Sequence, residues 1–477
     1  MEGRKAHRMT DHRKDDNGWQ WKSLESIAAD GAPILYGILQ PGADTPGGVP
    51  YVRPSEINSD VIDLSSIRRT TAAIASKYKR STLIRDDIIL SIVGTIGKVA
   101  LVPPELDGGN ITQSSVRIRV KPEITSPRYV AWALRSPYLR RQFDQHRLGT
   151  AVPRLNVAHV RALRVPVAPL DEQQRIVAEI EKQFTRLDAG VASLKRLQTA
   201  MKRYRTSVLK AACEGRLVPT EAELARKENR SYETGEQLLQ RLLKERREKW
   251  NGKGTYKEPP PIESSDLPTA PEGWTWVRFD LLGDDPFNTV QTGPFGAQLH
   301  NTEFIDKGMP VIAVGNLTGT GFTDTGLYFV SPSKAEQLRR YDVWSGDVLF
   351  ARSGATLGKV CVAPDHVQDW RMTGHILRAR LNRTVILPEI AVFALAALPA
   401  VRRQVFGNVR GVTRPGFNTA LLESIRLPLP PVAEQKRIVP EVERRLSVIE
   451  ELETVTSTEL QRATRLRGAI LARAFRG

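Results

Sequence analysis

The chain has 477 residues, which is long enough for two or three domains with cores of their own. Its net charge of +17 indicates a polyanionic partner and favours nucleic acid over the alternative that the charge only keeps the surface solvated. The two cysteines, Cys213 and Cys361, and the absence of Cys/His clusters or long apolar runs argue against a disulfide framework, a zinc site and a membrane span. We therefore expect a cytoplasmic protein that binds no metal.

The N-terminal half begins with a tail and continues as a domain of strands and loops. Residues 1–16 are charged throughout and lack an apolar stretch, so we expect a disordered tail and not a signal peptide. In 17–165, the runs VIDLSS, DIILSIVG and VRIRV predict short strands, because they are apolar or alternating and are bounded by Gly or Pro. A helical patch, YVAWALRS, and a strand punctuated by prolines, RVPVAPL, close this domain.

Residues 166–215 form the first long helix region. The helix is predicted from about Asp171 to Cys213, because apolar residues recur in steps of three and four and Gly215 ends the pattern. One narrow apolar stripe predicts a packing seam with another long helix. The expected seam residues are Ile176, Ile180, Phe184, Leu187, Val191, Leu194, Leu197, Met201, Tyr204 and Val208. Residues 216–271 follow as a charged helical segment and a Pro-, Gly- and Ser-rich stretch, which we expect to be an extended linker.

The C-terminal half repeats the N-terminal half, with a second domain in 272–427 and a second helix region in 428–477. At an offset of 262 residues, Asn156 falls on Asn418 and Glu172-Gln173 falls on Glu434-Gln435. Further upstream, DIILSIVGTIGKV corresponds to DVLFARSGATLGKV, and GWQW to GWTW. Residues 32–80 and 283–340 show no obvious correspondence. The second helix is predicted over about 434–475, with Ile438, Val442, Leu446, Ile449, Leu452, Leu460 and Ile470 in its seam.

This duplication predicts an α+β fold with pseudo-twofold symmetry. Two mixed α/β domains are each followed by a long α-helix, and the two helices pack against each other along their apolar seams. Each half is a shared frame that holds a variable insert, as expected for two modules that recognise different things.

Catalytic motifs are absent or defective. GATLGKV at 354–360 resembles a phosphate-binding loop, but only three residues separate Gly354 from Gly358, and Val360 stands where Ser or Thr would bind magnesium. No Asn-Pro-Pro-aromatic or Asp-Pro-Pro-aromatic tetrad of amino-methyltransferases occurs. Glu434-Gln435-Lys436 imitates half of a nuclease motif, but acidic residues at a helix start are explained by the helix dipole. We therefore predict no catalytic residue and no cofactor bound by this chain.

The candidate DNA contacts are basic and amide side chains in Gly- and Pro-rich loops. Residues 126–170 hold eight arginines and one acid, and arginine is suited to phosphate and guanine. The loops GTAVPRLN and RGVTRPGFN limit the freedom of their arginines, while QTGPFGAQL presents polar side chains able to read base edges. The candidates are Lys98, Arg154, Gln291, Thr292, Gln298, Arg352, Lys359, Arg410 and Arg414.

For some of these residues a structural role is an equal alternative. Lys98 and Lys359 could be solvated hairpin lysines, and Arg140-Arg141 and Arg402-Arg403 could bind acids on the long helices or on a partner. Phe295, within QTGPFGAQL, is expected to be a core anchor and not a base-stacking residue.

The repeated pattern as a whole resembles the specificity subunit of type I restriction-modification systems. The motifs that carry the resemblance are G-W-x-W, then G-x-x-G-K-V, then L-P-L-P-P-x-x-E-Q-x-R-I-V and a long helix, and they cover the chain from about residue 17. The resemblance implies that 17–165 and 272–427 are target recognition domains, each reading one part of a split, asymmetric sequence in double-stranded DNA. It implies that the two helices pack as an antiparallel coiled coil and hold these domains apart.

The resemblance also implies partners. The helices would dock methyltransferase subunits, two of them by expectation, and restriction motor-nuclease subunits would join the complex. S-adenosylmethionine, ATP and magnesium would then bind to the partners, and this chain would not be an enzyme. Two alternatives stay open: a stand-alone DNA methyltransferase or nuclease with fused recognition domains, and a basic coiled-coil regulator that binds DNA.

Overall fold

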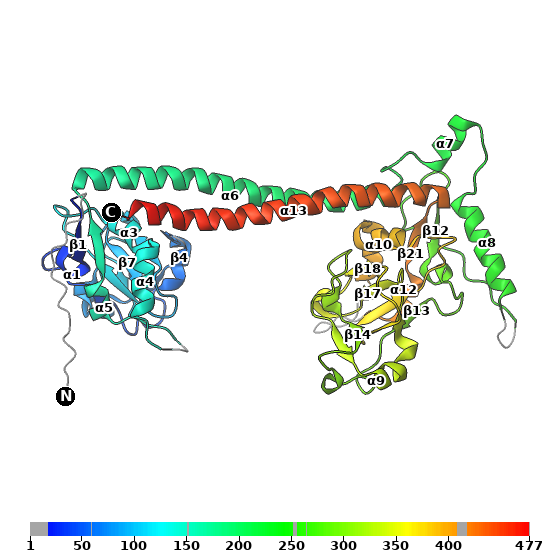
Figure 1. Ribbon diagram of the computed structural model, residues 1–477, viewed down its shortest axis with the longest axis horizontal. Coiled ribbons are helices and arrows are strands. Elements are labelled where there is room, and N and C mark those ends of the chain that lie inside the picture. Colours follow the sequence, from blue (N-terminus) through cyan, green and yellow to red (C-terminus); the bar gives the residue numbers. More distant parts are fainter. Residues whose placement is uncertain are drawn as a thin grey trace. The chain divides into compact units, whose positions relative to one another are not determined.

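The computed structural model describes residues 18–58, 60–149, 152–250, 255–263, 265–407 and 417–476, which divide into two compact units. Unit 1 comprises the residues up to 196 together with those from 456 onward, and unit 2 comprises 197–455. Each unit holds one repeat of the mixed domain, called domain 1 (18–167) and domain 2 (272–429), together with parts of both long helices (Figure 1).

Domain 1 is built on an antiparallel sheet of short buried strands, in the order β2-β10-β7-β8. These strands are β2 (Leu35–Tyr36), β7 (Ile88–Ser91), β8 (Val99–Leu101) and β10 (Ser115–Ile118). All four residues of β7 and of β10 are buried, because helices cover one face of the sheet and a second sheet lies against the other. Outside this sheet, β1 (Gln20–Ser23) pairs antiparallel with β11 (Arg164–Val167), which joins the two ends of the domain.

The second sheet of domain 1 comes mainly from the segment in which the two halves differ in sequence. Its order is β6-β3-β9, with β3 (Val49–Val52), β6 (Arg68–Thr70) and β9 (Asn110–Ile111). Strand β3 runs parallel to β9 and antiparallel to β6. A hairpin of β4 (Ile57–Asn58) and β5 (Val61–Ile62) and the helix α2 (Ala72–Ser76) complete this part.

Short helices with serine N-caps cover the first sheet of domain 1. Helix α3 (Pro127–Arg135) packs on β8, and Ser126 accepts a hydrogen bond from the backbone N–H of Tyr129 at its start. The remaining helices are α1 (Leu24–Ile27), α4 (Pro137–Gln145) and α5 (Val157–Ala162). The tryptophan motif splits between core and edge: Trp19 is buried, while Trp21 stacks on Tyr138 with ring centres 4.7 Å apart.

Domain 2 repeats this architecture, with four strands in its second sheet where domain 1 has three. The strand pair that joins its ends is β12 (Thr275–Arg278) with β21 (Arg426–Leu429). Its first sheet has the order β13-β20-β17-β18, made of β13 (Val290–Thr292), β17 (Val348–Ala351), β18 (Val360–Val362) and β20 (Ile376–Ala379). Its second sheet has the order β15-β14-β19-β16, made of β14 (Met309–Ile312), β15 (Tyr328–Val330), β16 (Asp342–Val343) and β19 (Trp370–Met372).

The helices of domain 2 follow the same order. They are α9 (Pro332–Gln337), α10 (Pro388–Ala397), α11 (Pro399–Gly407) and α12 (Thr419–Ser424). Helix α10 packs on β18 and is buried along nearly its whole length. No single helix in the described ranges is long and apolar enough to cross a membrane; only α10 and α11 taken together, bent by 72°, reach that length and composition.

The variable segments share one strand pairing although their sequences do not correspond. In domain 1, β3 of the variable segment runs parallel to β9, with Val52 paired to Ile111. In domain 2, β14 runs parallel to β19, with Ile312 paired to Met372. Along the chain, β9 comes directly before β10 and β19 directly before β20. The strands there are two to four residues long, so few side chains define their pattern and the sequence comparison finds no match.

The long helices are α6 (Leu170–Cys213) and α13 (Val432–Ala474), and they run antiparallel. In unit 1, Arg467 bonds Asp188 at 3.1 Å, and in unit 2, Arg205 pairs with Glu450 at 3.7 Å. The two ion pairs are related by the repeat offset of 262 residues, since Asp188 corresponds to Glu450 and Arg205 to Arg467. The higher-numbered residue of α6 pairs with the lower-numbered residue of α13. These pairs confirm the predicted antiparallel arrangement.

The apolar seam is narrower than the sequence predicts. Phe184, Met201, Ile438 and Val442 are buried as expected. Leu197, Tyr204 and Leu452 are exposed instead, because a pair of helices covers only one stripe of each.

Each long helix ends in the core of the other repeat. Leu471 and Phe475 belong to the core of domain 1, where Phe475 meets Tyr129 edge-on with ring centres 5.3 Å apart. Leu209 and Cys213 belong to the core of domain 2. Neither core is therefore complete without a helix end that comes from the other half of the sequence.

A buried glutamine fixes the start of each long helix. The Gln173 amide donates to the carbonyls of Ile124 and Ala168 at 3.1 and 2.8 Å and accepts from Thr125 and from the backbone N–H of Ser126. Gln435 makes the equivalent bonds. The repeated Glu-Gln motif thus ties the long helix to the segment that leads into α3 or α10.

The segment 216–271 contains the predicted charged helix, but it packs on domain 2, and its Pro-rich part differs from the expected extended linker. Its helices, α7 (Glu221–Glu228) and α8 (Gly235–Glu248), begin with complete capping boxes, and Leu238 and Leu242 of α8 are buried in the core of domain 2. The proline-rich part also lies on this domain, because Trp276 donates to the Pro268 carbonyl at 3.0 Å and Arg426 binds Asp266 through both of its terminal nitrogens.

Candidate nucleic-acid interface

Four loops of domain 1 meet at one edge of its first sheet, where β2 and β7 end and β10 begins. Backbone hydrogen bonds join them: Gly37 N–H to Thr112 O at 3.2 Å, Ile92 N–H to Ser114 O at 2.8 Å, and Leu155 N–H to Ile92 O at 2.8 Å. We call the surface formed by residues 37–40, 92–97, 112–114 and the described part of 146–156 the strand-end surface of domain 1. Because its loops are bonded to one another, its side chains are held in a fixed arrangement.

Arg154 lies on this surface. Its backbone exchanges hydrogen bonds with Leu148, at 2.9 Å in both directions, and the carbonyl of its neighbour Pro153 accepts from Gly94 N–H at 2.8 Å. The Arg154 side chain is exposed, and no hydrogen bond or ion pair joins it to another residue that the structure describes. The loop therefore presents a free guanidinium on a fixed backbone, which is the form in which arginine binds phosphate or a guanine edge.

Other arginines of the same region have roles within the fold. Arg135 donates to the Val99 carbonyl, Arg161 to the Ile34 carbonyl and Arg164 to the Trp21 carbonyl, while Arg128 pairs with Glu181 at 3.3 Å. Half of the eight arginines between residues 126 and 170 thus bind this chain, so the density of arginine in the sequence overstates the charge available to a partner.

Domain 2 has the corresponding strand-end surface, formed by residues 293–298, 352–357 and 373–375. Gly293 N–H donates to Ile376 O at 3.0 Å, Arg352 N–H to His375 O at 3.1 Å, and Phe417 N–H to Arg352 O at 2.9 Å. Phe417 corresponds to Leu155, so the same backbone bond occurs in both domains. The backbones approach so closely that a Cβ on Gly293 would lie 2.2 Å from the Thr373 carbonyl oxygen, which explains the glycine.

Arg352 and Thr292, two of the predicted contacts, meet on this surface. Arg352 occupies the position that Ile92 has in domain 1, and its Nη1 donates to Thr292 Oγ1 at 2.8 Å. Its guanidinium carbon lies 5.8 Å from the centre of the Phe295 ring. Phe295 is 60% exposed, so the expectation that it anchors the core is wrong: the bonds of Gly293 to the sheet turn the following loop outward.

The predicted glutamines are partly used by the fold. Gln298 accepts through Oε1 from the backbone N–H of Phe295 at 3.1 Å and from the Tyr341 hydroxyl at 2.8 Å. Gln291 donates to the carbonyl of Thr292 at 2.8 Å. Gln298 therefore shapes the loop that carries Phe295, and each glutamine retains only part of its amide for a ligand.

The two predicted lysines are not grouped with these residues. Lys98 donates through Nζ to the Pro54 carbonyl at 2.8 Å, so its ammonium is bound within domain 1. Lys359 lines a cleft beside the long helices, and no contact with Arg352 is found. Arg410 and Arg414 lie outside the described residues.

Several polar residues of the strand-end surfaces were not identified from the sequence. Gln40 and Gln113 are exposed in domain 1, and in domain 2 Ser353 and His375 lie 3.1 Å apart, from Ser353 Oγ to His375 Nδ1. The sequence held a signal for these residues, because the short loops before β10 and β20 align in the repeat. Only the sheet topology, however, places these two loops beside the other loops of each strand-end surface. Among the described residues, no group of three or more His, Cys, Asp or Glu side chains is placed to hold a metal ion.

Comparison with known proteins identifies the family. The EcoBI specificity subunit of Escherichia coli is 28% identical over 244 residues, which cover 50% of this chain and 50% of that protein. The EcoKI specificity subunit of Escherichia coli K12 is 21% identical over 354 residues, 73% of this chain and 65% of that protein. The matches thus span half to two thirds of these curated relatives.

A solved structure described as showing complex assembly and conformational transition of the type I R-M system contains a chain of the same fold. It superposes with a TM-score of 0.66 at 19% identity and covers 98% of this chain and 99% of that chain. A family model, type I restriction modification DNA specificity domain, matches residues 42–196 and 296–462, about two thirds of the sequence and once in each repeat. The chain therefore belongs to the family of type I restriction-modification DNA specificity proteins.

Proposed function

We propose that this chain is the DNA-recognition subunit of a type I restriction-modification complex and that each strand-end surface reads one part of a split DNA site. One observation carries the proposal: the two domains share backbone hydrogen bonds at these surfaces but carry different side chains there. Ile92 is replaced by Arg352, Gln113 by Gly374 and Ser114 by His375. Two such surfaces in one chain are suited to an asymmetric target whose two parts differ.

The chemistry of the surfaces supports DNA as the ligand. Arg154 is exposed and forms no hydrogen bond or ion pair with another described residue, and Arg352 is held by Thr292 beside the exposed ring of Phe295. Guanidinium, hydroxyl and imidazole groups on a rigid frame can both bind phosphates and read base edges. The net charge of +17 draws the polyanion to the chain at long range.

The helix pair supports the docking of other subunits. Within unit 2, Leu197, Tyr204, Val448, Leu452 and Val455 are 40–57% exposed, although they lie on helices with an apolar seam. Exposed apolar side chains gathered on one element are typical of a protein interface. We propose that they contact methyltransferase subunits, two per complex, and that restriction subunits join the same assembly in the cytoplasm. S-adenosylmethionine, ATP and magnesium bind to those partners.

The test is reconstitution with the partner. The purified chain, mixed with its methyltransferase subunit, is expected to confer adenine methylation at one split sequence, detected by sequencing the modified bases of a host that otherwise lacks it. The chain alone is expected to methylate, cleave and hydrolyse nothing. Turnover by the chain alone would favour the stand-alone enzyme, and DNA binding without partner-dependent methylation would favour the regulator.

A further inference from the structure

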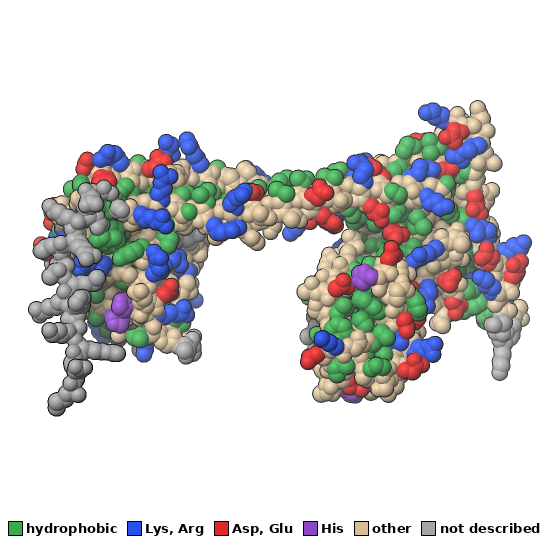
Figure 2. Space-filling model, viewed as in Figure 1, with side chains coloured by type: hydrophobic (Ala, Val, Ile, Leu, Met, Phe, Trp, Pro, Cys, Tyr) green, Lys and Arg blue, Asp and Glu red, His purple; other side chains and the backbone are tan. Residues whose placement is uncertain are grey.

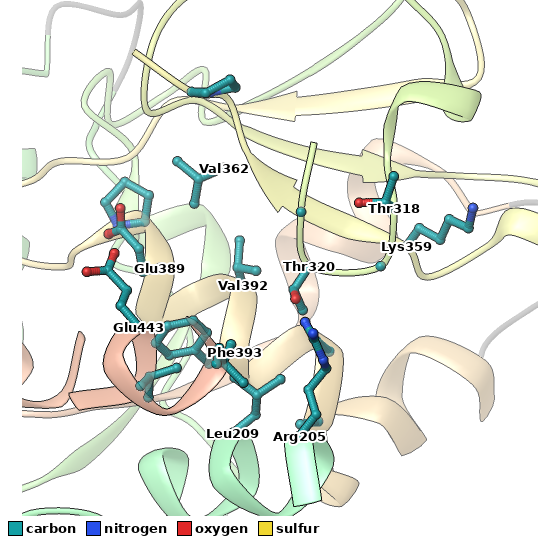
Figure 3. Close-up of a pocket in the computed structure, with 18 of the residues that line it drawn as sticks. Arg205, Leu209, Thr318, Thr320, Lys359, Val362, Glu389, Val392, Phe393 and Glu443 are labelled. Atoms are coloured by element: carbon teal, nitrogen blue, oxygen red, sulfur yellow. The ribbon is translucent and has the colours of Figure 1, made fainter. Parts of the chain in front are cut away.

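Unit 2 contains a cleft of about 1210 Å³ that the proposed function does not use. Its walls are α10, the adjoining stretches of α6 and α13, and the loops around residues 318–321 and 357–359 (Figure 3). The equivalent space in unit 1 measures only about 400 Å³, although it is bounded by the equivalent elements. The two repeats therefore differ here in side chains and not in architecture.

In unit 1 the space is filled by side chains of the chain itself. Arg135 lies with its guanidinium carbon 4.5 Å from the centre of the Trp132 ring and donates to the Val99 carbonyl, and burial lowers its pKa to about 10. Trp132 in turn meets Phe184 edge-on, with ring centres 5.0 Å apart. At the equivalent positions unit 2 has Ala396, Phe393 and Leu446, which are smaller, so the cleft stays open.

The charges at one end of the cleft differ in the same way. In unit 1, Arg128 at the start of α3 pairs with Glu181 of α6 at 3.3 Å. In unit 2 the equivalent residues are Glu389 and Glu443, and neither carboxylate forms a hydrogen bond or ion pair with another described residue. Figure 3 places both on the same side of the cleft, and Figure 2 shows acidic side chains gathered where α13 passes over domain 2.

We propose that this cleft binds a basic segment of the methyltransferase subunit, with a Lys or Arg between Glu389 and Glu443 and an apolar or aromatic side chain over Phe393 and Ala396. The segment would supply from outside the groups that Arg128, Arg135 and Trp132 supply within unit 1. This proposal rests on the proposed function, since it takes the methyltransferase subunit as the partner.

Two features select a protein partner. The Glu389 and Glu443 carboxylates repel DNA phosphates at their end of the cleft. Of the five described cations that line the cleft, three are bound within the chain: Arg205 pairs with Glu450 and Glu453 at 3.7 and 3.3 Å, and Arg383 and Arg402 donate to the carbonyls of Ser345 and Ala396 at 2.8 and 2.9 Å. The exposed apolar residues Leu452 and Val455 continue along α13 just beyond Glu450, so the cleft adjoins the surface proposed above for partner docking. A partner bound to the helix pair can therefore reach the cleft.

The test fills the cleft with the side chains that unit 1 uses. Glu389→Arg recreates the Arg128–Glu181 pair with Glu443, and Ala396→Arg places a guanidinium where Arg135 lies in unit 1. Each is expected to weaken binding of the methyltransferase subunit at least tenfold by isothermal titration calorimetry. Glu248→Arg, the same change at an exposed residue of α8 that lines neither the cleft nor the exposed apolar surface of the helix pair, should bind like the unmodified chain.

Glu389→Gln with Glu443→Gln keeps the shape of the cleft and guards against misfolding of the arginine variants. It should weaken binding and flatten the dependence of the affinity on salt. Affinities equal to that of Glu248→Arg in all three variants would overturn the proposal, as would variants that bind the partner normally and lose only DNA. Methylation by the unmodified complex tests the proposed function separately, so the cleft proposal can fail while the recognition function stands.

Discussion

Arg352 is the residue at which the two strand-end surfaces differ most in chemistry. Its counterpart is the apolar Ile92, and the guanidinium is oriented by Thr292 and Phe295. Arg352→Ala is therefore expected to weaken binding of the second half-site only. A lost base contact would cost about 1–3 kcal/mol and relax one position of the site, whereas a lost phosphate contact would lower the salt slope by about one unit. Fluorescence anisotropy of the reconstituted complex on half-site variants distinguishes these results, and Arg352→Lys controls for charge.

Arg154 allows the same test in domain 1 without a change in stability. Because its side chain is exposed and forms no hydrogen bond or ion pair with another described residue, and its backbone is fixed by Leu148, Arg154→Ala should leave the free energy of unfolding within about 0.5 kcal/mol of the original. DNA affinity should fall, measured by anisotropy at several salt concentrations. An unchanged affinity would remove Arg154 from the interface.

At the residue scale, the sequence identifies a contact candidate when the backbone around it is constrained and its side chain has no neighbour to bind. Arg154 meets both conditions, because Pro153 and the adjacent glycine loop fix its position. Lys98 carries the same charge, but it bonds the Pro54 carbonyl, which comes from a segment 44 residues away. Phe295 was misjudged because an aromatic ring is usually buried. Such tertiary neighbours have no signature in a single sequence.

At the element scale, the glutamine of the Glu-Gln motif has a measurable role. Gln435 bonds Leu387 N–H and the carbonyls of Val385 and Pro430 while fully buried. Gln435→Ala leaves these backbone groups without partners and should lower the free energy of unfolding by about 2–4 kcal/mol. Urea denaturation measures the change. Lys436→Ala, at the exposed next position of the same helix, is the control and should change little.

Glu434 at the same helix start gives a pH dependence. Burial raises the pKa of this carboxyl, against the opposing effects of the Glu221 N–H and of Arg437. A raised folded-state pKa means that ionising Glu434 costs more free energy in the folded chain than in the unfolded chain. This destabilisation of the fold is absent below the ordinary glutamate pKa and complete above the pKa of Glu434 in the folded state. The stability of Glu434→Gln relative to the original chain should therefore increase from pH 4 to pH 7, measured by urea denaturation. A constant or decreasing difference would contradict the raised pKa.

The long helices were the elements best predicted from the sequence. The expected span from about Asp171 to Cys213 matches α6, because forty residues of periodic pattern give many independent indications of one helix. The strands of residues 32–80 and 283–340 offer only two to four residues each, too few for a period to be evident. The Pro-rich part of 216–271 differs from the expected linker for another reason: its apolar residues are scattered among prolines, and the domain 2 surface that receives them is formed by distant residues.

At the scale of the whole molecule, the repeat predicts modular specificity. Exchanging residues 17–165 for the equivalent region of a relative should change one half of the methylated sequence and leave the other unchanged, because each strand-end surface is built within one domain. Sequencing of methylated bases in a strain that carries the exchange gives the result. A change in both halves would show that the two domains do not act independently.

Each of the long helices α6 and α13 begins in one unit and ends in the core of the other. This exchange of helix ends has an evolutionary consequence. A shorter ancestor with a single repeat would expose the counterparts of Leu209 and Cys213 at the end of its helix. Two copies could cover them only by exchanging helix ends, which gives a symmetric, intertwined dimer with two identical surfaces. Such a dimer is restricted to inverted repeats in DNA. Fusion of the two copies into one gene would have lifted that restriction, because mutations could then alter one surface and spare the other.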